Sequence, residues 1–336
     1  MAAELGFIIP TYNRPECVEY YLTSQMEAFA AREINVVVFD SSENDDTRIV
    51  VEAFTAKNPK AAKYLHYDRY EGNKADLRAL DKKVFTACQR YMDQYKYLWF
   101  SGDGTVFDIA LLWGDIQMLM AQDMDYIAVD STQFNVWKPR ADGVEYYTDS
   151  CTFFKECGWL LTLLGSNILR CEHIEETAAK YPVLRPDSFA FWIPMAFLRL
   201  FSEKPIHAAV VQKRNAYCVN PKRTEAFWMT NRDVLWQWAV TWPEAVDALP
   251  GYYNPVKEFV IKEQNRGRLF SLKGFLKLKA TGNLPLADVK RYRVYFKRVS
   301  DVPIWVIWLI SRSGEKVLPW LYKAYIAKKQ DKERNK

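Results

Sequence analysis

The sequence is poor in the residues that build metal clusters and disulfide frameworks. It holds six cysteines and three histidines in 336 residues, and no two cysteines form a Cys-x-x-Cys pair. A structural zinc site needs closely spaced thiolate and imidazole ligands, so the sequence argues against one. The N-terminus lacks a basic segment followed by a long apolar run. Together with the scattered cysteines, this favours reduced thiols in a cytoplasmic protein.

Internal repeats and low-complexity tracts are also missing, whereas apolar residues are plentiful at 49%. This composition excludes wholesale disorder, and the length suits one large domain with an appendage or two modest domains. Charge is distributed unevenly. Residues 256–336 carry 20 Lys and Arg against 7 Asp and Glu, a balance of +13, and the first 255 residues carry −8. The basic C-terminal quarter predicts an anionic partner, either nucleic acid or anionic lipid.

The hydrophobic pattern predicts strands that alternate with helices. We expect strands at 5–9, 34–39, 64–67, 97–100, 126–129, 144–154 and 207–211, and helices at 14–31, 47–57, 74–95, 108–122 and 188–201. This alternation predicts an α/β fold with a mostly parallel sheet covered on both faces, which binds ligands at the carboxyl ends of its strands. The composition becomes basic and aromatic near residue 251. We therefore expect a domain at 1–250 and a helical extension at 251–336.

Three predicted strands end in polar residues that would meet at one sheet edge. The first strand runs into Pro10-Thr-Tyr-Asn-Arg14, the second ends at Asp40-Ser41, and the fourth is followed by Gly102-Asp103-Gly104. Glycine permits the close approach of a ligand. A diphosphate leaving group needs its charge neutralised, usually by a divalent metal with oxygen ligands, and Asp103 suits that task. Asp40 suits hydrogen bonds from a base or ribose.

Together these residues resemble the inverting nucleotide-sugar glycosyltransferases with the GT-A fold, often called family 2, over about residues 5 to 215. The resemblance implies a Rossmann-like nucleotide-sugar-binding domain and a metal ion, Mn²⁺ or Mg²⁺, at Asp103. Its donor-binding residues would be Pro10, Thr11, Tyr12, Arg14, Asp40, Ser41, Gly102, Asp103 and Gly104. One departure is that Gly-Asp-Gly lacks a second Asp in the usual place, which puts metal affinity in doubt. Asp108 is either a second ligand or the cap of the next helix.

The family also needs a general base, because inversion proceeds by direct displacement. The base is usually a carboxylate that precedes a helix and follows a Gly-Ser segment. Here that segment is Gly165-Ser166-Asn167, and Asp187 precedes the next helix. We therefore predict Asp187 as the base, with Glu175 or Glu176 as alternatives. Trp192 could stack on the acceptor sugar, but a place in the core is the interpretation we prefer for it.

The apolar stretch from Val302 to Ile310 is far shorter than the ~20 residues needed to span a bilayer. It is flanked by Lys and Arg, and Trp305, Trp308 and Trp320 lie in or beyond it. This pattern favours a helix in the plane of an anionic membrane surface, although an ordinary packed helix is the alternative. No recognition motif accompanies the charge, so we do not expect nucleic acid as the partner. We expect peripheral association with the inner face of the cell membrane.

The leading hypothesis is transfer from a UDP-sugar to a lipid-linked or polysaccharide acceptor, as in capsule or lipopolysaccharide synthesis. A Rossmann-type dehydrogenase is one alternative, but it needs Gly-x-Gly-x-x-Gly after the first strand, where this chain has Pro-Thr-Tyr-Asn-Arg-Pro. A catalytically inactive scaffold that binds a nucleotide sugar is the second alternative, because the second Asp is missing.

Overall fold

A computed structural model describes residues 3–72, 79–131, 142–181, 191–223, 234–266 and 269–313. The chain divides into two compact units. The first comprises Met1–Thr224 with Leu249–Tyr253, and the second comprises Glu225–Ala248 with Asn254–Lys336.

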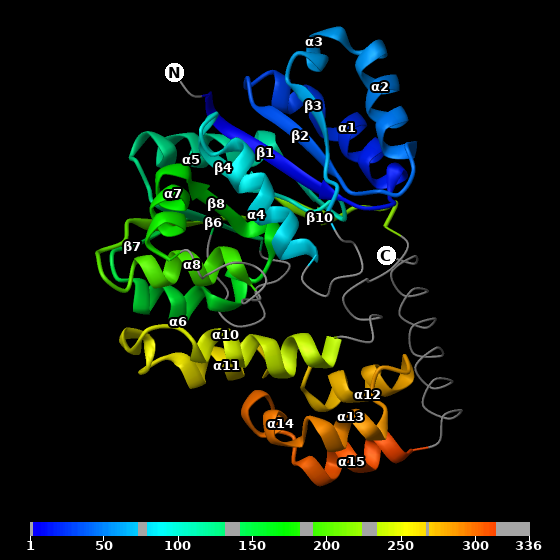
Figure 1. The fold of residues 1–336 in the computed structure, drawn as a ribbon, viewed down its shortest axis with the longest axis vertical. Helices are drawn as coiled ribbons and strands as arrows, with labels where there is room; N and C mark the ends of the chain where they lie inside the picture. Colours follow the sequence, from blue (N-terminus) through cyan, green and yellow to red (C-terminus); the bar gives the residue numbers. More distant parts are fainter. Residues whose placement is uncertain are drawn as a thin grey trace. The chain divides into compact units, whose positions relative to one another are not determined.

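The first unit is built on an eight-stranded sheet in the order β3-β2-β1-β4-β8-β6-β9-β7 (Figure 1). Its strands are β1 (Ala3–Thr11), β2 (Asn35–Asp40), β3 (Leu65–Arg69), β4 (Tyr95–Phe100), β6 (Tyr126–Ser131), β7 (Gly143–Tyr147), β8 (Asn167–Arg170) and β9 (Ala208–Lys213). Strands β1 to β4 are parallel to one another, and β6 is parallel to β9. Only β8 and β7 run antiparallel to their neighbours. The predicted mostly parallel sheet is confirmed.

Helices cover both faces of this sheet. One face packs against α1 (Pro15–Ala30), α2 (Asp46–Lys57) and α5 (Ile109–Ala121), with α3 (Pro59–Ala62) beside them. The other face packs against α4 (Ala79–Tyr91), α6 (Ser150–Leu161), α7 (Cys171–Lys180) and α8 (Trp192–Leu200). Aromatic side chains fill the first interface, where the rings of Phe7 and Trp99 meet edge to face at 4.9 Å. The α/β class predicted from the hydrophobic pattern is confirmed.

Four short elements complete the first unit. Strand β5 (Thr105–Phe107), which follows Asp103, pairs with β10 (Tyr217–Val219) in a two-stranded antiparallel sheet. The 3₁₀ turns are η1 (Leu164–Ser166) and η3 (Gly251–Tyr253).

One stretch differs from its expected structure. Residues 144–154 were expected to form one strand, but β7 ends at Tyr147 and α6 begins at Ser150. Asp149 starts the helix, because its carboxylate accepts a hydrogen bond from the backbone N–H of Thr152 at 2.7 Å. An Asp at this position is a strong helix start, and it outweighs the strand preference of the preceding tyrosines.

The second unit is helical. Its described elements are the π-helical turn η2 (Trp236–Thr241), α10 (Trp242–Asp247), α11 (Lys257–Arg266), α12 (Leu272–Ala280), α13 (Leu286–Arg291), α14 (Arg293–Val299) and α15 (Ile304–Arg312). Phe270, Phe275 and Phe296 form its aromatic centre, with ring centroids 5.6 Å apart. No helix among the described residues is long and apolar enough to cross a membrane.

The boundary between the units differs from the one expected near residue 250. Residues 225–248 group with the second unit. A reason is visible at Arg298, whose guanidinium donates to both carboxylate oxygens of Asp247, at 2.7 and 2.9 Å. This ion pair ties α14 to the end of α10 across 51 residues of sequence. Arg298, far along the chain, therefore pairs residues 225–248 with the second unit, although the composition of that segment does not indicate a boundary.

Candidate functional site

The polar residues predicted at three strand ends do meet at one edge of the sheet. Thr11 and Asp40 are register partners at the ends of β1 and β2. Asp103 lies three residues beyond the end of β4, on the other side of β1. The Thr11 hydroxyl donates to Asp103 Oδ2 at 2.6 Å, across 92 residues of sequence. The expected convergence of the three strand ends is confirmed.

Asp103 is held by contacts on both carboxylate oxygens. Besides Thr11, the guanidinium of Arg14 donates to Oδ1 at 3.1 Å. The Asn220 side chain donates to the Asp103 carbonyl at 2.8 Å, and the Asn220 N–H donates to the Gly104 carbonyl at 3.1 Å. The turn that presents this carboxylate is therefore fixed by both its side chain and its backbone.

The two glycines beside Asp103 have different environments. A Cβ added at Gly104 would lie 3.0 Å from the side chain of Arg223, so little space is left there. A Cβ added at Gly102 would meet no atom within 4 Å. The Gly102 side of the turn is the open side, where a ligand can approach the backbone.

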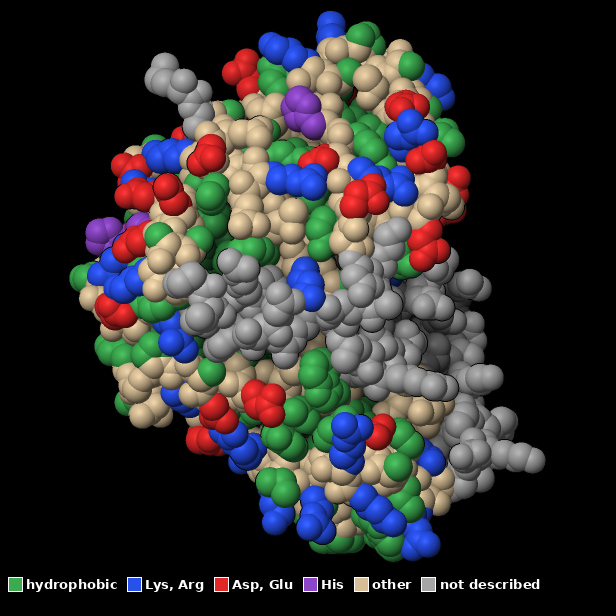
Figure 2. Space-filling view, viewed as in Figure 1, with side chains coloured by type: hydrophobic (Ala, Val, Ile, Leu, Met, Phe, Trp, Pro, Cys, Tyr) green, Lys and Arg blue, Asp and Glu red, His purple; other side chains and the backbone are tan. Residues whose placement is uncertain are grey.

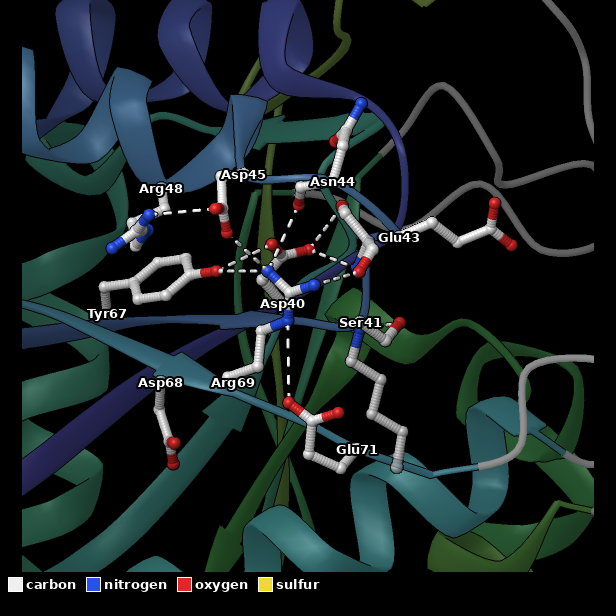
Figure 3. A network of polar contacts seen from close by, with 12 residues as sticks. Asp40, Ser41, Glu43, Asn44, Asp45, Arg48, Tyr67, Asp68, Arg69 and Glu71 are labelled. Carbon is white, nitrogen blue, oxygen red and sulfur yellow. Dashed lines mark hydrogen bonds and ion pairs between the residues drawn. The ribbon is translucent and has the colours of Figure 1, made fainter.

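Asp40 is fully buried, and its carboxylate points into the protein. It accepts hydrogen bonds from the N–H of Ser42 at 2.8 Å and from the Ser42 hydroxyl at 2.5 Å. The Tyr67 hydroxyl also donates to it, at 2.9 Å (Figure 3). Burial, helped by the nearby Asp40, raises the pKa of Tyr67 and so keeps its phenol a donor. Because Asp40 is fully buried, direct contact with a nucleobase would require the surrounding side chains to open.

The turns that follow β1 and β2 are joined into one structure. Asn13, which has a left-handed φ of 50°, donates its N–H to the Ser42 hydroxyl at 2.8 Å. Its side-chain oxygen accepts from the N–H of Glu43 at 3.0 Å. Arg69 at the end of β3 donates to the Ser42 carbonyl at 2.7 Å. The hydroxyl of the exposed Tyr12 donates to Glu43 at 2.9 Å. A ligand at this edge would meet a preformed surface.

Lys83 is a site residue that the sequence reading missed. It lies in the first turns of α4 and is only 5% exposed. Its ammonium donates to the Thr11 carbonyl at 2.5 Å and to the Ser41 hydroxyl at 2.8 Å. The available signal was its position four residues before the buried Ala87, on the apolar face of the helix. A lysine on the apolar face of a helix is rarely buried unless its ammonium has polar partners.

The Gly165-Ser166-Asn167 segment lies at the same edge of the sheet. It precedes β8, which runs antiparallel to β4, so it lies where β4 ends. Trp99 donates its indole N–H to the Gly165 carbonyl at 2.8 Å. A Cβ at Gly165 would lie 2.6 Å from the Phe107 ring, so this contact requires glycine. Helix α7 follows β8 and therefore begins at the opposite edge.

Glu175 and Glu176 lie on α7, and the structure does not bring them to Asp103. The Glu176 carboxylate contacts His173 Nδ1 at 3.3 Å and is paired with the ammonium of Lys204. His173 Nε2 in turn contacts Asp125, the residue before β6, at 2.6 Å. Burial acts to raise the pKa of Glu176, but Lys204 and His173 outweigh it and hold the pKa low. These contacts give Glu176 a structural role at the edge of the sheet opposite Asp103.

Asp187 lies outside the described residues. Helix α8 begins five residues later, and the N–H of Trp192 donates to Asp81 Oδ1 at 3.1 Å. Asp81 is two residues before Lys83 in α4, so α8 begins near the edge that carries Asp103. The Trp192 side chain is buried and packs edge to face on Phe85 at 4.8 Å. The core position predicted for Trp192 is confirmed, and the alternative of stacking on an acceptor sugar is excluded.

The described residues offer the divalent metal predicted at Asp103 a single carboxylate that is shared with other donors, and no second acidic ligand. Both oxygens of this carboxylate already accept hydrogen bonds, from Thr11 and Arg14. Asp108 is not a second ligand, since it caps α5 by accepting from the N–H of Leu111 at 3.0 Å. No group of three His, Cys, Asp or Glu in the described ranges could hold a metal ion.

Comparison with known proteins identifies the fold. No protein-family model matches the chain, and no curated protein matches its sequence. A crystal structure of residues 1–349 of S. aureus TarS superposes with a TM-score of 0.53 at 14% identity, covering 92% of this chain and 90% of that one. Another structure of TarS gives a TM-score of 0.51 at 12% identity, covering 92% of this chain and 55% of that one. The mannosyltransferase PcManGT from Pyrobaculum calidifontis, in complex with GDP-Man and Mn²⁺, gives 0.47 at 14% identity, covering 93% and 86%. The chain thus has the GT-A-type fold of glycosyltransferases.

Proposed function

We propose that the chain is a glycosyltransferase that moves a sugar from a nucleoside-diphosphate sugar, a UDP-sugar, to an acceptor hydroxyl. The observation that carries the proposal is the meeting of Thr11, Arg14 and Asp103 with the preformed turn at Asp40, at the carboxyl edge of a GT-A-type sheet. Ligands of open α/β sheets bind at this edge. Residues 1–349 of TarS have been crystallised with UDP-GlcNAc, which supports a donor of this class.

The arrangement divides the donor between two turns. The Asp40-Ser41-Ser42 turn forms the nucleoside end, where burial and three hydrogen bonds on Asp40 fix the backbone. The end of β1 forms the diphosphate end, where Arg14 and Lys83 each supply a positive charge. Fixed charges aimed at a leaving group stabilise the charge that develops on it. Transfer needs that stabilisation when the bond between the anomeric carbon and the diphosphate oxygen breaks.

We propose inversion by direct displacement, with Asp187 as the general base. Its carboxylate would take the proton of the acceptor hydroxyl while that oxygen attacks the anomeric carbon from the side opposite the diphosphate. The start of α8 beside Asp81 supports this choice, because it brings the chain back to the Asp103 edge. Glu175 and Glu176 are disfavoured by the position of α7 and by the contacts that occupy Glu176.

We propose an anionic membrane surface as a partner of the second unit and a lipid-linked or polysaccharide acceptor. On α15, Trp305, Trp308, Leu309 and Arg312 follow one another at helical spacing, and Trp305 is 63% exposed. Ile307 and Ile310 pack inward on the opposite side. Figure 2 shows Lys and Arg side chains among apolar ones over α12 to α15. Exposed tryptophan with neighbouring basic residues suits the boundary between lipid headgroups and acyl chains.

A catalytically inactive scaffold that binds a nucleotide sugar is the second candidate, favoured by the single engaged carboxylate at Asp103. A thermal-shift screen of nucleotide sugars tests binding, since a ligand of the folded state raises the melting temperature. Release of free UDP or GDP from the stabilising donor then tests turnover. We expect a UDP-sugar to stabilise the chain and to be turned over with acceptor. Stabilisation without turnover under any condition would favour the scaffold, and no stabilisation by any nucleotide sugar would overturn both.

A further inference from the structure

Arg14 contacts the carboxylate that the family resemblance assigns to a divalent cation. Its Nη1 lies 3.1 Å from Asp103 Oδ1, and the Thr11 hydroxyl lies 2.6 Å from Oδ2. A divalent ion bound to this carboxylate would have to share it with both donors. It would also place two positive charges beside a guanidinium, an unfavourable arrangement in a partly buried site. The carboxylate is therefore used by the protein itself.

The end of β1 carries a net positive charge that favours a diphosphate. Arg14 and Lys83 are cations and Asp103 is an anion, so these three side chains sum to +1. Lys83 is buried against the Thr11 carbonyl, which fixes its charge close to the strand end. The Arg14 side chain is 30% exposed, which leaves it accessible to a ligand.

The chemistry of arginine suits the same role. A guanidinium has five N–H donors in a rigid fork, so an arginine held by a carboxylate through one of them still binds phosphate oxygens through others. Such charge-assisted bonds are about twice as strong as neutral ones. Asp103, itself fixed by Thr11 and Asn220, gives the guanidinium a defined direction.

We propose that Arg14, oriented by Asp103, neutralises the donor diphosphate in place of a divalent cation. The inference rests on the glycosyltransferase function proposed above. When the bond from the anomeric carbon to the diphosphate oxygen breaks, the electron pair stays on the nucleoside diphosphate, and Arg14 meets that charge. The proton of the acceptor goes to the general base. Asp103 and Thr11 are positioning residues, because they act through Arg14.

Calorimetric titration of the full chain with UDP, in EDTA and in Mn²⁺, tests the inference. We expect dissociation constants that agree within about threefold, since the protein supplies the charge. Arg14→Met should weaken UDP binding by about tenfold to a hundredfold, the loss expected for charged hydrogen bonds. Uridine, which lacks the diphosphate, should bind the variant as well as the wild type. Arg14→Lys keeps the positive charge but lacks the forked guanidinium, so its affinity for UDP should lie between those of the wild type and Arg14→Met.

Arg32→Met is the matched control. Arg32 follows the other end of α1 and donates to the Ala28 carbonyl at 2.8 Å, so UDP and uridine binding should both be unchanged. Asp103→Asn should lower kcat more than it weakens UDP binding, because it leaves one acceptor oxygen for both Thr11 and Arg14 and so loosens the orientation of Arg14 without removing its charge. If Arg14→Met fails to fold, the inference is still tested by UDP binding of the wild type in EDTA and in Mn²⁺, and by UDP binding of Arg14→Lys.

The failures of the two proposals differ. UDP binding that disappears in EDTA and returns with Mn²⁺ would overturn the role of Arg14 and leave the glycosyltransferase in place. Mn²⁺ binding without nucleotide that Asp103→Asn abolishes would overturn it too. If neither UDP nor another nucleoside diphosphate binds in EDTA or in Mn²⁺, the proposed function itself falls.

Discussion

Tyr67 donates a hydrogen bond to Asp40 between neighbouring parallel strands, with 2.9 Å between the phenol oxygen and Oδ2. The bond leaves the other carboxylate oxygen to the N–H and hydroxyl of Ser42. Asp40 therefore stabilises the turn after β2 from its buried side and does not point toward a ligand. This explains how a fully buried carboxylate can belong to a ligand site.

Asp40→Ala should raise the KM for the donor by about tenfold and change kcat less. The turn that forms the nucleoside end would lose its anchor, but this end is remote from the breaking bond. The buried donors of Ser42 and Tyr67 would lose their acceptor, and we expect a loss of about 1–3 kcal/mol in the free energy of unfolding. Initial rates against donor concentration and a denaturant titration measure both. An unchanged donor KM would remove Asp40 from the site.

Tyr67→Phe is the matched control for Asp40→Ala, because it removes one of the three bonds and keeps the charge. We expect a smaller rise in donor KM than for Asp40→Ala. An equal or larger rise would mean that Tyr67 contacts the donor directly.

Asp103→Ala should abolish transfer while leaving the fold intact. The change removes the acceptor for Thr11 and Arg14 at the open side of the β4 turn, so the diphosphate charge is no longer met in a fixed geometry. The backbone hydrogen bonds from Asn220 remain and should preserve the turn. Turnover at saturating donor, alongside far-UV circular dichroism, is the measurement. Near-normal turnover in the purified variant would refute the assignment.

The sequence predicts the strand ends well because each carries its own signal. A buried apolar run followed by Pro-Thr-Tyr-Asn, or by Asp40, marks both a strand and its end, and the parallel order then places the ends on one edge. Lys83 was missed for a different reason. Its role depends on two acceptors, the Thr11 carbonyl and the Ser41 hydroxyl, which are 72 and 42 residues away in sequence. Local patterns carry no record of such contacts.

The carboxylates proposed as bases show the same limit. Glu176 and Asp187 both follow the Gly165 segment in sequence. Because β8 runs antiparallel to β4, the helix after β8, which carries Glu176, begins at the edge of the sheet opposite Asp103. That direction is not readable from the four residues of β8, Asn167–Arg170, because parallel and antiparallel strands are composed alike over so short a length. The grouping of residues 225–248 with the second unit likewise depends on the distant Arg298.

Asp187→Asn should retain donor binding and lose transfer by about a hundredfold or more, the usual contribution of a general base. The amide is nearly isosteric with the carboxylate but cannot accept the proton of the acceptor hydroxyl. Donor affinity by calorimetry and transfer rate with acceptor separate the two effects. Glu175→Gln and Glu176→Gln are the controls and should keep their transfer rates. The reverse pattern would assign the base to α7.

Alkaline pH should destabilise the chain through its buried tyrosines. Burial raises the pKa values of Tyr21, Tyr97 and Tyr126 above 10.0. In the unfolded chain these phenols ionise near pH 10, while the folded state keeps them neutral. The stability they contribute is therefore complete below pH 10 and declines as pH rises from there toward the folded values. Melting temperatures between pH 7 and 11 should be level to about 9 and then fall.

Tyr97→Phe supplies the internal check on the alkaline decline. It removes the hydrogen bond to the Met124 carbonyl, of 2.9 Å, and should cost about 1 kcal/mol at neutral pH. It should also make the alkaline decline shallower. A decline of unchanged slope would exclude Tyr97 as a contributor.

The exposed face of α15 should bind anionic membranes without crossing them. Truncation near residue 251 is a poor test, because it would divide the second unit and leave Asp247 without Arg298. Point changes in the full chain avoid this problem. Trp305→Glu with Leu309→Glu places two anions on the face and should weaken binding to anionic liposomes at least tenfold, since each side chain contributes about 1.5–3 kcal/mol when buried in an apolar medium. Ile49→Glu, at a 56% exposed position on α2 in the first unit, is the matched control.

Co-sedimentation with liposomes at low and high salt measures this binding. Apolar insertion and attraction to lipid charge act together, so binding of the wild type should weaken with salt but persist. Neutral liposomes should bind the wild type less, because they offer no anionic headgroups to Arg312 and the lysines of α12. Equal binding of the double variant and the Ile49→Glu control would remove α15 from the contact. Wild-type protein that stays in the supernatant with anionic liposomes at low salt would exclude a membrane role for the second unit, and its basic surface would then need another anionic partner.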